Sequence, residues 1–217
     1  MPNPILVLGN KAYSSWSLRP YIALAAAGIP FEEKVIRLYV PEATPEILKY
    51  SPTAKVPVLV DGATVIWESL AICEYVAEKA PDAGLWPAAA EARAHARAIA
   101  NEMHAGFAPL RRAYPFNARR TPRPLAPDAE AAADIARITQ LWRDARARFG
   151  TGGPFLFGTF TIADAMYAPV AGRFRQYAVD LDPVCAAYLD AIHALPAMRR
   201  WIADAAAEPW VVERFEL

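Results

Sequence analysis

The chain has 217 residues, and its 23 basic and 23 acidic side chains leave no net charge, so no field of one sign attracts it to nucleic acid or anionic lipid. The apolar run over 21–29 is far shorter than the roughly 18 residues of a membrane span, and the first residues lack the basic region of a secretory signal. We therefore expect a cytoplasmic protein with neither nucleic acid nor a membrane as a partner.

Strand-like and helix-like segments alternate over the first 80 residues, which predicts an α/β domain of order β-α-β-α-β-β-α. The pair Asp61-Gly62 between two apolar runs is a hairpin signal, so the last two strands are predicted to be antiparallel. Residues 81–88 are predicted to be a linker. The predicted strands are 4–9, 31–38, 57–61 and 64–66, and the predicted helices are 16–27, 44–50 and 68–79.

After Pro87 the chain becomes rich in alanine with a helical period, which predicts an all-helical domain over 89–217. Thr161 and Asp164 have the spacing of an N-terminal capping box, with Asp in place of the commoner Glu, and we assign Asp164 a structural role. The fold class is thus an α/β domain followed by an all-α domain. The predicted helices are 89–113, 127–149, 162–178, 183–194 and 196–206.

The first predicted strand leads into the first helix through the sequence YSSWS, which contains Ser14, Ser15 and Ser17. Where a strand, a turn and a helix N-terminus meet, backbone N–H groups and the helix dipole favour anions such as a thiolate. Ser14 and Ser17 have the spacing of a redox C-x-x-C motif without its thiols. The alternative interpretation is that Ser14 or Ser15 only caps the helix.

The cysteines and histidines indicate neither a disulfide framework nor a metal site. Two well-separated cysteines suit a reducing compartment. The three histidines lack metal-ligand spacing, so we expect no metal and assign them surface or interface positions.

Two further segments fit a peptide-like ligand. If the bond before Pro57 is cis, Val56 can offer its backbone to an extended ligand, whereas a trans proline would only open an edge strand. Ser69, at a helix entry, can cap that helix and face a carboxylate, and Glu68 can face an ammonium group. A ligand with these two charges at one end, a peptide-like middle and a sulfur matches the three segments. Glutathione has that layout.

The segments SSWS, KVPVL and ESLAI, followed by a helical domain, resemble the cytosolic glutathione S-transferase family over essentially the whole chain, with the serine-type, zeta-like bacterial members as the nearest in pattern. The resemblance implies a thioredoxin-like N-terminal domain, a homodimer and glutathione as cosubstrate. It places Ser14 at the thiolate, Val56 before the cis-proline, and Lys55 near the glycyl end of glutathione. It places Glu68 and Ser69 as the acidic-Ser pair.

A serine hydroxyl can stabilise the glutathione thiolate by donating a hydrogen bond. A bond to an ionised partner contributes roughly 1.5–3 kcal/mol, which corresponds to roughly one to two units of thiol pKa. Ser14 is the first candidate for this catalytic role and Ser15 the second, because the sequence does not separate adjacent serines.

Residues 103–127 contain five arginines and no acidic residue. These arginines can be a solvated helix end and loop. Because the resemblance places this segment at the substrate cleft, we predict that at least one of three of them binds a carboxylate of the acceptor. The predicted acceptor-binding residues are Arg111, Arg112, Arg119, Phe107 and Phe116, with Tyr114 as a further candidate for the apolar wall, although core packing is the alternative for these aromatic residues.

The expected function is a glutathione transferase that activates the thiolate for attack on a small electrophile, with a role in detoxification. Trp16 stands where zeta-type enzymes usually have a cysteine, so whether this chain shares their isomerase activity stays open. The alternatives are an isomerase of the maleylacetoacetate type, a glutathione peroxidase and a non-catalytic glutathione-binding protein.

Overall fold

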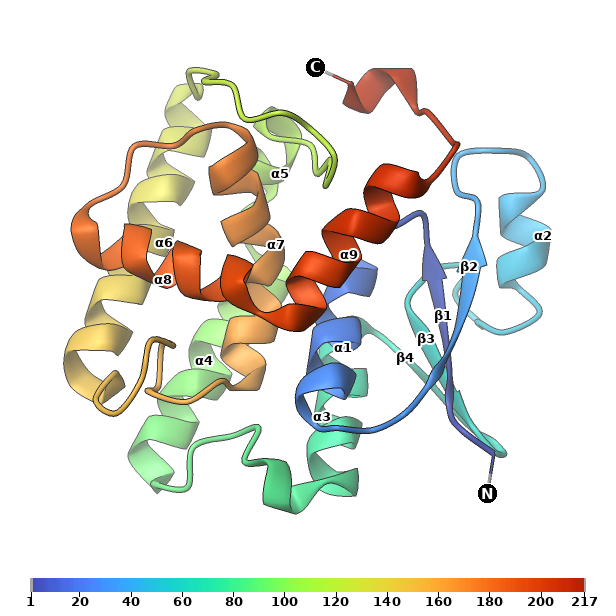
Figure 1. The fold of residues 1–217 in the computed structure, drawn as a ribbon, viewed down its shortest axis with the longest axis horizontal. Coiled ribbons are helices and arrows are strands. Elements are labelled where there is room, and N and C mark those ends of the chain that lie inside the picture. The colour runs from blue at the N-terminus through green and yellow to red at the C-terminus, as the bar shows by residue number, and fades with distance from the viewer. Residues whose placement is uncertain (1, 217) are drawn as a thin grey trace.

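The computed structural model describes residues 2–216, and its four-stranded sheet lies beside a group of helices (Figure 1). The strand order is β2-β1-β3-β4. Strand β1 (Ile5–Gly9) pairs in parallel with β2 (Glu32–Ile36) and antiparallel with β3 (Val58–Asp61). Strand β4 (Thr64–Trp67) pairs antiparallel with β3, so the predicted hairpin is confirmed.

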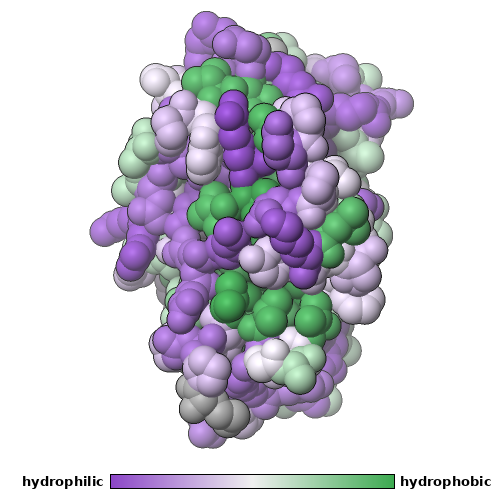
Figure 2. Space-filling model, turned by 90° about the vertical axis from the view of Figure 1, so that its right-hand side faces the viewer, coloured by the Kyte–Doolittle hydropathy of each residue, from purple (hydrophilic) through white to green (hydrophobic). Residues whose placement is uncertain are grey.

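Helices cover both faces of the sheet. Because side chains alternate along a strand, Val7 of β1 packs toward α2 (Ala43–Ile47), and its two neighbours pack toward α1 (Ser15–Ala26) and α3 (Ser69–Lys79). On the face shown in Figure 2, apolar side chains form separate patches down the middle, with hydrophilic side chains between and around them. The sheet is thus a central layer, and α1 is the helix that joins it to the rest of the molecule.

The second part of the chain is helical, and α7 lies at its centre. Nearly every residue of α7 is buried, because α1, α4 and α8 pack around it. The capping box at its start is confirmed, with the Thr161 N–H donating to Asp164 Oδ2 at 2.7 Å. The helices are α4 (Ala90–Ala105), α5 (Ala108–Ala113), α6 (Ala129–Phe149), α7 (Ile162–Gln176), α8 (Pro183–Ala194) and α9 (Pro196–Ala207), with single 3-10 turns at Pro81–Ala83 and Glu213–Phe215.

The single helix predicted over 89–113 is wrong, because the chain breaks between α4 and α5. Phe107 has a φ of 61°, in the left-handed region, which ends the helical hydrogen-bond pattern. A Cβ atom on Gly106 would lie 2.8 Å from the backbone oxygen of Glu102, so only glycine fits the approach to the break. The apolar period continues across the break and therefore did not reveal it.

No helix within residues 2–216 is long and apolar enough to cross a membrane.

After α9 the chain returns to the turn that precedes α1, and we call residues 208–216 the C-terminal strap (Figure 1). The Glu208 carboxylate accepts hydrogen bonds from the backbone N–H groups of Lys11 at 2.6 Å and Ala12 at 3.0 Å. Near the end of the strap, Phe215 packs against Tyr13, with ring centroids 5.6 Å apart. The strap thus lies beside the segment that carries the serines.

Candidate active site

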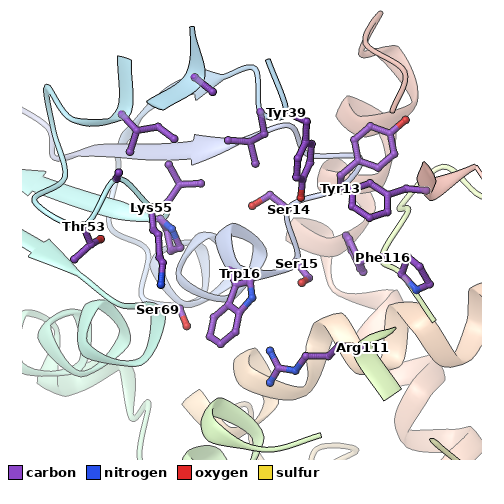
Figure 3. Close-up of a pocket in the computed structure, with 18 of the residues that line it drawn as sticks. Tyr13, Ser14, Ser15, Trp16, Tyr39, Thr53, Lys55, Ser69, Arg111 and Phe116 are labelled. Carbon is purple, nitrogen blue, oxygen red and sulfur yellow. The ribbon is translucent and has the colours of Figure 1, made fainter. Parts of the chain in front are cut away.

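A cleft of about 820 Å³ lies where the sheet-containing part meets the helical part (Figure 3). Its walls come from the turn before α1, the segment around the Val56–Pro57 bond, the start of α3, the α5 region and the C-terminal strap. Most of the residues predicted from the sequence meet there. The predicted residues that line the cleft are Ser14, Ser15, Lys55, Val56, Pro57, Glu68, Ser69, Arg111, Arg112 and Phe116.

Ser14 occupies the N-cap position of α1, but its hydroxyl makes no hydrogen bond to the helix N–H groups. The interpretation of Ser14 as a simple cap is therefore wrong. Its Oγ lies 2.7 Å from Ser17 Oγ, and Ser17 Oγ accepts a hydrogen bond from the Gly9 N–H at 3.2 Å. Ser14 is buried with 6% of its surface exposed and lines the cleft, so its hydroxyl is available to a ligand.

Ser15 lies on the arginine side of the same turn. Its Oγ accepts a hydrogen bond from Arg173 Nη2 at 3.3 Å. Figure 3 shows Ser15 pointing toward Arg111 and Ser14 lying near Tyr39. The two adjacent serines therefore have different environments, which the sequence did not distinguish.

The segment before β3 has the predicted backbone geometry. The Val56–Pro57 peptide bond is cis, as predicted. Strand β3 begins at Val58, so Val56 lies in the cleft wall outside the sheet ladder. Its backbone groups can therefore pair with an extended ligand.

At the start of α3, Glu68 and Ser69 provide one acidic and one hydroxyl group. Glu68 has a φ of 67° and a half-exposed side chain, whose Oε2 lies 3.6 Å from His104 Nε2. Ser69 is fully buried, and its Oγ accepts a hydrogen bond from Arg19 Nη1 at 3.3 Å. The predicted capping role of Ser69 is wrong, because no side chain caps α3. With the N-terminus of α3 and Arg19 beside it, this end of the cleft favours a carboxylate.

Arg19, Arg111 and Arg173 form a cluster of guanidinium groups, which we call the arginine cluster; Arg19 and Arg173 are buried and Arg111 is partly buried. Arg19 and Arg111 both pack on the ring of Trp16, with guanidinium carbons 4.1 and 4.7 Å from its centroid. Within residues 2–216, none of these three arginines forms a salt bridge to an acidic side chain. The Nε atoms of Arg19 and Arg111 are buried without a hydrogen-bond partner in the part of the chain that the structure describes.

The arginine cluster concentrates positive charge, which Asp134 offsets only in part, at Arg111. Burial lowers the pKa of Arg19, and the charges of Arg111 and Arg173 lower it further. Burial, together with Arg111, lowers the pKa of Arg173 to about 9, so this guanidinium stays protonated at neutral pH. Burial also lowers the pKa of Arg111. An anion bound beside these groups would reduce their mutual repulsion.

The structure corrects three predicted acceptor-binding residues. Phe107 and Tyr114 are buried in the hydrophobic core and do not line the cleft. Arg119 also lies outside the cleft lining, and it donates hydrogen bonds to the backbone oxygens of Glu208 at 3.1 Å and Trp210 at 3.0 Å. It holds the C-terminal strap. Local sequence did not reveal this role because its partners are about 90 residues away.

Arg112 lies at the rim of the cleft. It forms an ion pair with Glu130 at 2.8 Å, in which both side chains are mostly exposed. Such a pair contributes little to stability. Arg112 therefore fits the alternative interpretation of this segment, a solvated helix end.

Sequence reasoning missed four residues of the cleft or its walls, which are Arg19, Arg173, Tyr13 and Tyr39. Arg19 is the one charged residue of α1, and that isolation was a usable signal, whereas Arg173 shares α7 with Asp164 and Arg175 and does not stand out in this way. The Tyr13 hydroxyl is engaged by the strap, because it accepts from the Val212 N–H at 3.0 Å and donates to Glu216. Burial and Glu216 raise the pKa of Tyr13.

Comparison with known proteins matches both parts of the chain to one family. Residues 13–79 match the model for the glutathione S-transferase N-terminal domain, and residues 87–204 match the model for its C-terminal domain. The chain belongs to the glutathione S-transferase family. The serine turn and the Val56–Pro57 bond thus lie in a glutathione S-transferase N-terminal domain, and Arg111 and Arg173 lie in its C-terminal domain.

Individual glutathione S-transferase relatives include isomerases. A probable maleylacetoacetate isomerase of Caenorhabditis elegans is 41% identical over 107 residues, 49% of each chain. A maleylpyruvate isomerase of Ralstonia sp is 32% identical over 188 residues, 80% of this chain and 86% of the relative. The chain aligns with about half the length of the first curated relatives it matches.

One solved structure is similar over almost its whole length. It is described as maleyl pyruvate isomerase, a bacterial glutathione S-transferase of the zeta class, and it is 28% identical with a TM-score of 0.73. The match covers 94% of this chain and 98% of that one. The N-terminal sheet and the helices that follow therefore have the arrangement of a zeta-class member of the family.

Proposed function

We propose that this member of the glutathione S-transferase family is an enzyme that activates the glutathione thiolate for attack on a small electrophile bearing a carboxylate. Glutathione, as cosubstrate, lies along the cleft with its peptide backbone at Val56 and its glycyl end near Lys55. Its α-carboxylate lies at Ser69 and its ammonium group at Glu68.

The availability of the Ser14 hydroxyl carries the proposal for the thiolate. This hydroxyl faces the cleft at the N-terminus of α1 and is not used to cap the helix. A hydrogen bond from it, added to the positive end of the helix dipole, lowers the pKa of a bound thiol from its usual value of about 8.5 toward neutrality. The nucleophile is then present in its reactive form at physiological pH.

The arginine cluster supports the proposal for the acceptor. Arg111 and Arg173 line the same cleft, and Arg173 contacts the serine turn through Ser15. Guanidinium groups pair with carboxylates in two parallel hydrogen bonds, so they orient an acid acceptor as well as attract it. The electrophilic carbon would then be held beside the thiolate.

A second candidate is a glutathione-dependent isomerase, which the names of the maleylacetoacetate and maleylpyruvate relatives favour. In this reaction the thiolate adds to a carbon–carbon double bond, the resulting single bond rotates, and the thiolate leaves again. The arginine cluster suits this chemistry equally, because it would stabilise a maleyl-type carboxylate. Trp16, at the turn where zeta-type enzymes usually have a cysteine, distinguishes this chain from them.

Several further features of the family are proposals for this chain. We propose a cytoplasmic homodimer that acts in detoxification, with a glutathione-binding domain over 1–80, a linker over 81–88 and an acceptor-binding domain over 89–217. The two family models support the division, because residues 80–86 lie between them.

Two assays test the proposed function. Ultraviolet absorbance of bound glutathione, titrated against pH, is expected to show a thiolate that forms well below pH 8.5. A neutral chloronitroaromatic acceptor and a small unsaturated carboxylic acid are then compared in wild type and in Arg111→Ala. We expect kcat/KM to fall only for the acid. Arg112→Ala is the matched control, because Arg112 lies at the rim of the cleft.

A protein that binds glutathione without forming a thiolate would be a binding protein and not a transferase. If Arg111→Ala affects both acceptors equally, the arginine cluster does not bind the acceptor carboxylate. Conversion of a cis unsaturated acid to its trans isomer without net loss of glutathione would select the isomerase.

A further inference from the structure

Ser17 has two hydrogen-bond contacts that determine where its own proton lies. Its side chain is fully buried in the first turn of α1. Its Oγ accepts the backbone N–H of Gly9 at 3.2 Å and lies 2.7 Å from Ser14 Oγ. No other hydrogen bond of this hydroxyl is present among the residues that the structure describes.

These two contacts determine the direction of the hydrogen bond between Ser14 and Ser17. The Gly9 N–H is a donor, so Ser17 Oγ accepts there and keeps its own proton for another partner. A buried hydroxyl proton without an acceptor is costly, and Ser14 Oγ is the acceptor within reach. The opposite direction, with Ser14 donating to Ser17, would leave the Ser17 proton unpaired in the protein interior.

We propose that Ser17 is a positioning residue that donates to Ser14 Oγ and thereby directs the Ser14 proton into the cleft, toward the glutathione thiolate. The inference rests on the proposed role of Ser14. Three donors then point the same way, from the Gly9 N–H to Ser17, from Ser17 to Ser14, and from Ser14 to the sulfur. Strand β1 and helix α1 hold the first two of these groups.

The chain of donors has two effects on the bound thiol. Each bond polarises the next, which strengthens the last bond by about 10–30%. The bond from Ser17 also holds Ser14 in one orientation, whereas a serine hydroxyl without a partner has three staggered positions. Together they predict that loss of Ser17 raises the thiol pKa by about half a unit to one unit, less than the loss of Ser14 itself.

Substitutions at Ser17 test the inference. Ser17→Ala removes the donor, and Ser17→Cys keeps the volume of the side chain but replaces the hydroxyl by a weak donor. Ser17→Thr retains a hydroxyl. Thr139→Val is the matched control, because it removes a buried helical hydroxyl that bonds only to its own helix, at Ala136 O. The thiol pKa of bound glutathione is titrated by ultraviolet absorbance in each folded variant, with thermal unfolding measured in parallel.

We expect a higher thiol pKa in Ser17→Ala and Ser17→Cys, the wild-type value in Thr139→Val, and a value close to wild type in Ser17→Thr. A lower melting temperature with an unchanged thiol pKa would show that Ser17 only joins β1 to α1, and would overturn the inference. If the wild type forms no thiolate, the proposed function fails first. If the wild type forms a thiolate and the thiol pKa is the same in Ser17→Ala and Ser17→Cys as in the wild type, only the role of Ser17 fails.

Discussion

Removal of the Arg119 side chain is expected to release the C-terminal strap without unfolding the protein. Arg119 donates to the backbone oxygens of Glu208 and Trp210 at 3.1 and 3.0 Å, and pairs with Glu216 at 3.0 Å. Each backbone bond contributes about 1 kcal/mol, and the partly exposed ion pair adds about 0.5–1 kcal/mol. The loss is therefore roughly 2.5–3 kcal/mol, which makes the open strap roughly 100-fold more populated in Arg119→Ala.

Limited trypsin digestion measures this population, because Arg214 lies within the strap and is cleaved when the strap opens. We expect cleavage after Arg214 to accelerate by up to roughly 100-fold in Arg119→Ala, while the global melting temperature changes little. Arg120→Ala is the control, because Arg120 contacts Gln176 and Tyr177 and not the strap. Equal cleavage rates in the two variants would refute the reasoning and show that the contacts of Arg119 do not hold the strap.

Three further predictions concern single groups. Ser14→Ala is expected to raise the thiol pKa of bound glutathione by roughly one to two units in the ultraviolet titration, and an unchanged titration would exclude Ser14. Asp164→Ala removes the acceptor of three hydrogen bonds at 2.7–3.1 Å and should cost roughly 3–5 kcal/mol in urea unfolding, whereas a cost under about 1 kcal/mol would contradict the buried capping box. Burial lowers the pKa of His193 from 6.5 to about 4 in the folded protein. As the pH falls from 6.5 toward 4, the unfolded chain therefore binds a proton at His193 that the folded protein does not bind, and stability is lost. His193→Gln should remove up to about 3 kcal/mol of that pH dependence, and identical pH profiles of unfolding would argue against it.

The backbone geometry of the proposed glutathione half of the site could be predicted from the sequence because its determinants are local. The cis bond before Pro57 and the hairpin after β3 each depend on a few adjacent residues, and both are confirmed. Local reasoning was wrong about two possible caps, because neither the alternative cap at Ser14 nor the cap at Ser69 is present in the structure. Those hydroxyls bond to Ser17 and Arg19 instead.

The proposed acceptor half could be predicted only in outline, because its residues come from distant elements. The run of arginines without acidic residues correctly predicted that Arg111 lies in the cleft. The same run included Arg119, whose partners lie near the C-terminus. Arg173 contacts Ser15 across 158 residues of sequence, a pairing that no local pattern reports. The domain boundaries and the roles of the site residues stay predictions.

The packing of α1 against α7 limits how the two parts of the chain can be exchanged between relatives. Arg173 reaches Ser15 from α7, and a Cβ atom on the preceding Gly172 would lie 2.9 Å from Phe116 in the cleft wall. A chimera that combines this sheet domain with the helices of another family member must therefore keep both α7 positions, or its serine turn loses a contact. Acceptor preference is accordingly expected to diversify through substitutions at α5 and the strap more readily than through recombination at the linker.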